Sequence, residues 1–65
     1  MWIPVTQRVL GSKTIKNVIN SDFVERIAES TSGCYLEMNS GFTVEIEESI
    51  NYWLDAINGV RKNGE

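Results

Sequence analysis

The chain has 65 residues, a net charge of −3 and 42% hydrophobic residues, enough for one domain with a small core. One cysteine and no histidine exclude an intrachain disulfide, a four-ligand zinc site and histidine-based catalysis. The lone thiol, the absence of a signal-peptide pattern and the lack of an apolar run of about 18 residues predict a cytoplasmic protein that does not enter a membrane. Small domains without disulfides or metals often oligomerise, so we expect a homo-oligomer.

Residues 2–10 and 14–19 form the first predicted hairpin, with a turn at Gly11-Ser12-Lys13. Apolar and polar residues alternate along the first segment, which is typical of a strand with one buried face. The residues expected to face inward are Ile3, Val5 and Val9. Because Pro4 lacks a backbone donor, we expect it on an edge strand or among the first residues of its strand.

The next segment carries mixed signals. It opens with three residues that favour turns and helix caps: Asn20, Ser21 and Asp22. The apolar residues that follow have the spacing of one helical turn, although the same stretch also fits an extended chain: Phe23, Val24, Ile27 and Ala28. We expect a single helical turn at 22–24 that runs into a strand at 25–30.

Residues 34–39 and 42–47 are predicted as a second hairpin. Its inward residues are Cys34, Leu36, Met38, Phe42, Val44 and Ile46, and its outward residues are Tyr35, Glu37, Thr43, Glu45 and Glu47. Opposed residues share a face, so Met38 should oppose Phe42. This register leaves a three-residue loop that ends at Gly41 in the left-handed conformation. A two-residue turn would rotate the apolar face of one strand into water.

An amphipathic helix is predicted over about 49–59, with Ser49 as N-cap and Gly59 at its end. Its apolar stripe is Ile50, Trp53, Leu54 and Ile57. Residues 61–65 should fray. The sequence therefore predicts an α+β fold in a single domain over 1–65, with a small antiparallel sheet of four to five strands and one C-terminal amphipathic helix packed on one face.

The charge is unevenly distributed. Residues 1–21 hold three basic residues and no acid, whereas residues 22–65 hold all nine acids and three basic residues. This split predicts a basic hairpin that meets an acidic surface on a partner or on a second copy. Three aromatic residues also fall outside the predicted core. The candidate partner contacts are Trp2, Arg8, Lys13, Lys16, Tyr35, Glu37, Glu45 and Tyr52.

Catalysis is not expected. Cys34 is predicted to face inward and has no histidine base, and the strand carboxylates are predicted to be exposed. We therefore predict no catalytic, cofactor-binding or metal-binding residue. A nucleic-acid role would use the basic residues with Trp2 or Tyr35 for stacking, but net acidity weakens phosphate binding. The basic residues concerned are Arg8, Lys13, Lys16 and Arg26.

Three segments resemble the small flagellar and swarming-motility proteins of the FlbD type. They are residues 20–29, residues 35–41 with their Leu-x-x-x-x-Gly turn, and residues 44–50 with Val-Glu-Ile-Glu-Glu-Ser-Ile at the helix start. The resemblance implies a short cytosolic β-sheet protein with one helix, no enzymatic activity and a partner-binding role. The same middle section is similar to the first half of LytTR-type DNA-binding domains, whose DNA-contacting loops belong to a second half.

These observations predict a small non-enzymatic protein-interaction module that self-associates and modulates a larger partner. Two alternatives stay open. One is a nucleic-acid-associated regulator, and the other is a phage or mobile-element accessory protein that binds a host factor.

Overall fold

The computed structural model describes residues 1–59, so the predicted fraying of residues 61–65 lies outside the described residues. The elements are β1 (Trp2–Arg8), β2 (Thr14–Asn20), the 3-10 helix η1 (Ser21–Phe23), β3 (Val24–Ser30), β4 (Gly33–Met38), β5 (Thr43–Ile46) and α1 (Ile50–Asn58). The strands form one antiparallel sheet in the order β2-β1-β5-β4-β3. The predicted α+β fold is confirmed.

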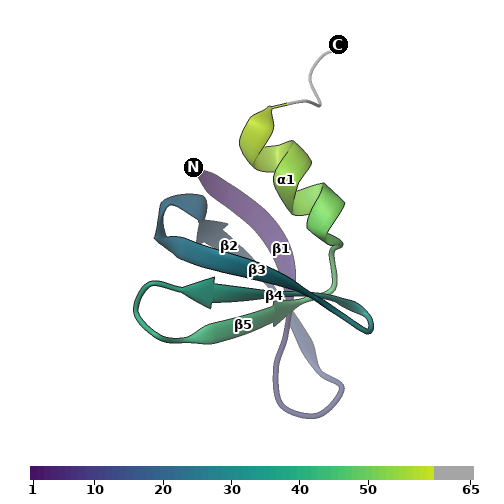
Figure 1. Ribbon diagram of the computed structural model, residues 1–65. Coiled ribbons are helices and arrows are strands. Elements are labelled where there is room, and N and C mark those ends of the chain that lie inside the picture. Colours follow the sequence, from purple (N-terminus) through teal and green to yellow (C-terminus); the bar gives the residue numbers. More distant parts are fainter. Residues whose placement is uncertain (60–65) are drawn as a thin grey trace.

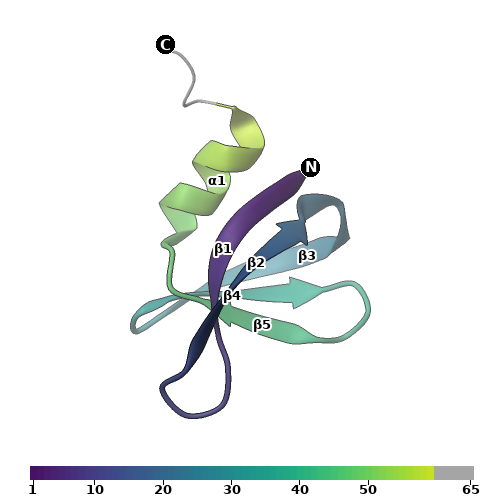
Figure 2. The same cartoon turned by 180° about the vertical axis from the view of Figure 1, so that it is seen from behind.

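The sheet consists of two local units joined by a short seam. β1 and β2 form one hairpin, and β3, β4 and β5 form a meander. The two units meet where β1 pairs with β5, through Gln7 opposite Ile46 and Arg8 opposite Glu45. Both cartoon views show β1 crossing β4 and β5 steeply, with α1 lying beside β1 (Figures 1 and 2). The sheet is therefore strongly bent, and α1 covers only part of its inner face.

The core lies between this inner face and α1. Its buried members are Ile3, Val5, Ile19, Cys34, Leu36, Ile46 and Trp53. Trp53 is the largest of them and is 1% exposed. α1 contacts β1 and β3, which belong to different units, so its packing helps to hold the two units together.

The helix begins and ends as the sequence predicts. The hydroxyl of Ser49 accepts a hydrogen bond of 3.1 Å from the backbone N–H of Tyr52. Gly59 ends the helix in the left-handed conformation, with φ of 67°. The predicted stripe was wrong at Leu54, which is 38% exposed. Ala56 packs against the core instead, because the bent sheet meets only one side of the helix.

The second hairpin has the predicted register. Cys34 lies opposite Ile46, and Leu36 lies opposite Val44. The N–H of Met38 donates to the carbonyl of Phe42 at 2.8 Å, and Gly41 has φ of 100°, so the three-residue loop is confirmed. The burial of Phe42 was wrong: its side chain is 74% exposed. Phe42 has the inward phase, but it belongs to the loop between β4 and β5, and both cartoon views show this loop away from α1 (Figures 1 and 2).

The ambiguous segment combines a turn, a strand and a bulge. The Oδ1 atom of Asn20 accepts from the N–H of Asp22 at 3.0 Å and caps η1. β3 then pairs with β4, and its register shifts between Val24 and Arg26. The extra residue of this bulge places Val24 and Ile27 on the same face although they are three positions apart. The helical spacing seen in the sequence is therefore the spacing of a bulged strand.

β1 is not an edge strand, so that reading of Pro4 was wrong, whereas its place near the start of β1 was right. The side of β1 that β5 leaves open is closed by the connection to α1. Both carboxylate oxygens of Glu48 accept from the N–H of Thr6, at 2.8 and 3.1 Å. The carbonyl of Thr6 accepts from the N–H of Glu47 at 2.9 Å, and the hydroxyl of Tyr52 donates to the carbonyl of Pro4 at 2.6 Å.

Candidate functional site

The outer face of the sheet, opposite α1, carries paired charges. The guanidinium of Arg8 lies 3.8 Å from a carboxylate oxygen of Glu45 and 3.4 Å from one of Glu47. It also donates to the hydroxyl of Ser32 at 3.0 Å. The basic N-terminal half and the acidic remainder therefore meet within the chain at this point. Arg8 and Glu45, both candidate partner contacts, already bind each other.

A second pair lies beside the first. Arg26 on β3 donates to both carboxylate oxygens of Glu37 on β4, at 3.1 and 2.9 Å. The hydrogen bond that Arg26 donates to Glu37, together with the negative charge of Glu37, raises the pKa of Arg26. Such forked pairs fix the orientation of both side chains. Glu37 is thus another candidate contact that has a partner within the chain, and Arg26 is not free to bind phosphate.

The aromatic candidates are in different situations. Tyr52 ties α1 to β1 through its hydroxyl, although its side chain is 37% exposed. Tyr35 lies on the outer face of β4, opposite Glu45 on β5 and Ala28 on β3. Trp2, at the start of β1, is 65% exposed and so is the most accessible of the three.

The two lysine candidates are exposed on the β1–β2 hairpin. Lys13 precedes β2 and Lys16 lies within it. Neither forms a salt bridge in the part of the chain that the structure describes. The structure therefore places seven of the eight predicted contacts in two groups, and the eighth, Tyr52, lies on α1. Arg8, Tyr35, Glu37 and Glu45 share the outer face and are mostly paired, whereas Trp2, Lys13 and Lys16 lie on the first hairpin.

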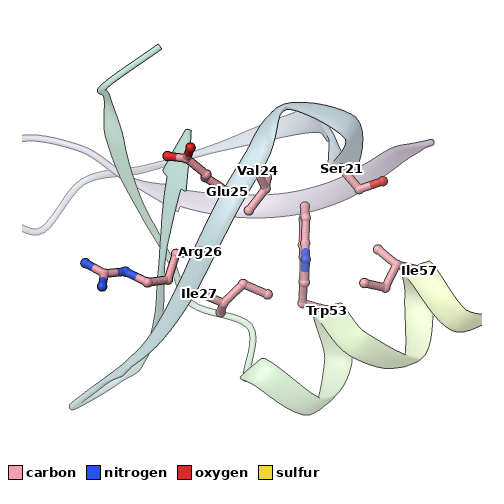
Figure 3. Close-up of a pocket in the computed structure, with 7 residues that line it drawn as sticks. All are labelled: Ser21, Val24, Glu25, Arg26, Ile27, Trp53 and Ile57. Carbon is pink, nitrogen blue, oxygen red and sulfur yellow. The ribbon is translucent and has the colours of Figure 1, made fainter. Parts of the chain in front are cut away.

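A hollow lies elsewhere, between β3 and α1, and we call it the β3–α1 groove. Its volume is about 290 Å³. Its lining residues are Ser21, Val24, Glu25, Arg26, Ile27, Trp53 and Ile57. Four apolar side chains, from Val24 and Ile27 on β3 and Trp53 and Ile57 on α1, converge on this space, while Arg26 points away from it (Figure 3). The groove is therefore apolar; Glu25 lines it from β3, but its carboxylate points away from the four apolar side chains (Figure 3).

The groove lies along an open strand edge. The N–H of Met38 donates to the carbonyl of Phe42. The even-numbered residues of β4 therefore form backbone hydrogen bonds with β5, and the odd-numbered residues form them with β3. The register of β3 on β4 then directs the backbone of Arg26 and Ala28 toward β4. The backbone N–H and C=O groups of Ile27 and Glu29 consequently face the free edge of β3, because β3 ends the sheet.

β2 forms the other free edge. Hydrogen bonds from Val9 to Lys13 and from Ser21 to Met1 show that the odd-numbered residues of this hairpin strand bond β1. The even-numbered residues therefore direct their backbone groups outward. One outward donor is capped locally, because Oδ1 of Asn17 accepts from the N–H of Val18 at 2.9 Å. β2 thus presents a free edge at which one outward backbone N–H is already bonded to a side chain of the same strand.

Cys34 is a core residue. Its side chain is buried beneath α1 as part of the core cluster. Burial, and to a smaller extent the negative charge of Glu48, raises the pKa of its thiol. Nucleophilic thiols need the opposite shift. Within residues 1–59 no group of three or more histidine, cysteine or acidic side chains is placed to hold a metal ion.

The sequence did not reveal the groove. Val24 and Ile27 were given no common face, because the bulge that aligns them leaves no local signal apart from their spacing. Trp53 and Ile57 were assigned to the apolar stripe of the helix. Periodicity does not show which part of this stripe the bent sheet leaves next to a groove. Glu29 was assigned to a strand but not to an edge, which depends on the order of strands in the sheet.

Comparison of the chain with protein-family models, curated proteins and solved structures finds no match. The resemblance to FlbD-type proteins stays a prediction. No helix among residues 1–59 has both the length and the apolar character needed to cross a membrane.

Proposed function

We propose that this protein is a non-enzymatic interaction module that binds an extended segment of a protein partner at the free edge of β3. The observation that carries the proposal is the coincidence of an open strand edge with an apolar groove. Ile27 and Glu29 offer unpaired backbone groups at this edge, and the β3–α1 groove lies beside them. Strand addition uses backbone hydrogen bonds for affinity and a neighbouring groove for alternate side chains.

The charge of β3 and the apolar groove indicate what kind of segment would bind. Glu25 lines the groove, and Glu29 is exposed on the same strand. The base of the groove is apolar, and its volume of about 290 Å³ can hold a branched aliphatic side chain. A strand with an apolar residue opposite Ile27 and, two positions along, a lysine or arginine opposite Glu29 would match both features.

Other features support binding over catalysis. The buried thiol of Cys34 has a raised pKa, and the carboxylates of the outer face are paired with arginines. The pairing of Arg8 and Arg26 also removes two of the four basic residues that a nucleic-acid interface would use. We further propose a cytoplasmic location, since a small domain with one unpaired cysteine suits a reducing compartment.

Selection from a displayed library of random short peptides tests the proposal. We expect enriched peptides to carry a basic residue two positions from an apolar residue and to bind in an extended conformation. Glu29→Pro should abolish their binding, because proline removes an outward N–H at position 29 without touching the bonds of β3 to β4. Glu29→Gln is the matched control, since it keeps the N–H and should only weaken binding.

The β3 amides report the site directly. Binding should slow hydrogen exchange at Ile27 and Glu29 and change the fluorescence of Trp53, which lines the groove. Peptides that bind Glu29→Pro as tightly as the parent chain would refute the proposal, as would a selection that enriches no peptide. Thermal unfolding of each variant checks that the fold is kept.

A further inference from the structure

The two free edges of the sheet carry opposite charge. β2 and the turn before it hold Lys13 and Lys16 and no acid. β3 holds Glu25 and Glu29, and its one basic residue, Arg26, is neutralised by Glu37. Both strands are seven residues long. Each edge is therefore complementary to the other and not to itself.

Hydrogen-bond phase restricts how these edges can pair. In an antiparallel ladder, opposed residues must direct their backbone groups toward each other. Ile27 and Glu29 can thus face only the even-numbered residues of β2. One of these registers sets Val18 opposite Ile27 and, two positions along each strand, Lys16 opposite Glu29. It joins an apolar pair to an ion pair and places no like charges directly opposite.

The side chains fit this register. Val18 lies opposite Pro4 on β1 and is 51% exposed. With Val18 paired to Ile27, its side chain would point to the α1 side of β3 and enter the β3–α1 groove. Trp2 lies on the same face of the hairpin, two residues before Pro4 along β1, and is also exposed. It would approach the groove from beyond Val18 and cover its open side.

We propose that β2 of one copy of this protein adds antiparallel to β3 of a second copy, with Val18 opposite Ile27 and Lys16 opposite Glu29. This inference rests on the proposed function and names a second copy as the partner that supplies the strand. Each copy uses one edge to donate and the other to accept, so the contact is head-to-tail and continues beyond two copies unless a ring closes. Docking replaces the bond between Asn17 and the N–H of Val18 with a bond to the second copy.

Pairing of identical edges from two copies is electrostatically less favourable than pairing of β2 with β3. Two β2 edges would bring the lysines of both copies to one seam without a carboxylate. Two β3 edges would gather the glutamates in the same way. Head-to-tail pairing is the arrangement that lets Lys16 meet Glu29.

Charge reversal at the two edges tests the proposal by sedimentation velocity and light scattering. The parent chain should grow in mass with concentration. Lys16→Glu and Glu29→Lys should each raise the dissociation constant by roughly tenfold or more, since each sets like charges opposite each other. The double variant should regain association, because it restores the ion pair with its signs exchanged. Lys13→Glu is the matched control: it changes the net charge equally but lies outside the proposed ion pair.

Mixing the single variants gives the decisive result. Lys16→Glu carries a glutamate at both edges, and Glu29→Lys carries a lysine at both edges, so neither variant should associate alone, and their mixture should regain growth through alternating copies. A parent chain that stays monomeric at millimolar concentration would overturn the proposal. So would association that neither variant weakens, or a symmetric dimer whose variants do not complement each other. Peptide binding at β3 by a strictly monomeric chain would leave the proposed function standing and remove only this inference.

Discussion

Replacement of Glu48 tests how β1 is held where β5 ends. The carboxylate of Glu48 accepts from the backbone N–H of Thr6 through both oxygens, at 2.8 and 3.1 Å, in a partly buried position. Glu48→Ala leaves this N–H without its partner. A hydrogen bond to a charged group contributes about 1.5–3 kcal/mol. Because water can reach part of the site, we expect a loss of about 1–2 kcal/mol, which corresponds to about 5–15 °C in melting temperature for a domain of this size.

Two further variants separate this bond from other effects. Glu48→Gln keeps an acceptor but not the charge, so it should cost about half as much. Glu47→Ala removes a neighbouring carboxylate whose ion pair with Arg8 is partly exposed, and should cost less than about 1 kcal/mol. Thermal melts followed by circular dichroism give the magnitudes, and hydrogen exchange at the Thr6 amide shows where the protection is lost. Equal losses for Glu47→Ala and Glu48→Ala, or unchanged exchange at Thr6, would refute the reasoning.

Four other substitutions have defined outcomes. Leu36→Ala should lower the free energy of unfolding by about 2–5 kcal/mol, a large part of the total stability of a domain this small. Trp2→Ala should change this free energy by less than about 0.5 kcal/mol. Similar losses for the two variants in denaturant unfolding would contradict the assignment of core and surface. Gly33→Ala should cost about 1–3 kcal/mol, because its methyl group would meet the backbone of Ile46, the last residue of β5, and of Glu47, which follows it. An unaltered melting temperature would show that this backbone can move aside. The raised pKa of the Cys34 thiol stabilises the fold fully below about pH 8.5, and this contribution should fade at higher pH as the unfolded thiol ionises first. Cys34→Ala should lose this part of the alkaline decline in urea unfolding, and an identical decline would show that other groups cause it.

Local signals predicted the parts of the fold that local interactions determine. The three-residue loop before Phe42 followed from the alternation of apolar residues, which allowed only one register. The helix ends followed from Ser49 and Gly59, whose preferences act within one turn. These features depend on neighbours in sequence, so a single chain contains enough information to predict them.

The errors arose where the bend of the sheet decides the outcome. Phe42 and Leu54 both have apolar side chains at the phase expected for burial, yet both are exposed. A short helix that crosses a bent sheet cannot cover its full length, and periodicity carries no measure of that coverage. The same limit hid the candidate site, since the groove exists only because part of β3 and part of α1 stay uncovered.

The narrow seam between β1 and β5 has a consequence for the order of folding. The β1–β2 hairpin and the β3–β5 meander each close through short loops, whereas Gln7 and Ile46 must meet across most of the chain. Closing that long loop costs entropy, which two residue pairs, the hydrogen bonds of Pro4 and Thr6 to the segment after β5, and the packing of α1 must offset. We therefore expect the seam to form last, after both units are in place. Substitutions at Gln7 should then speed unfolding and leave the folding rate almost unchanged.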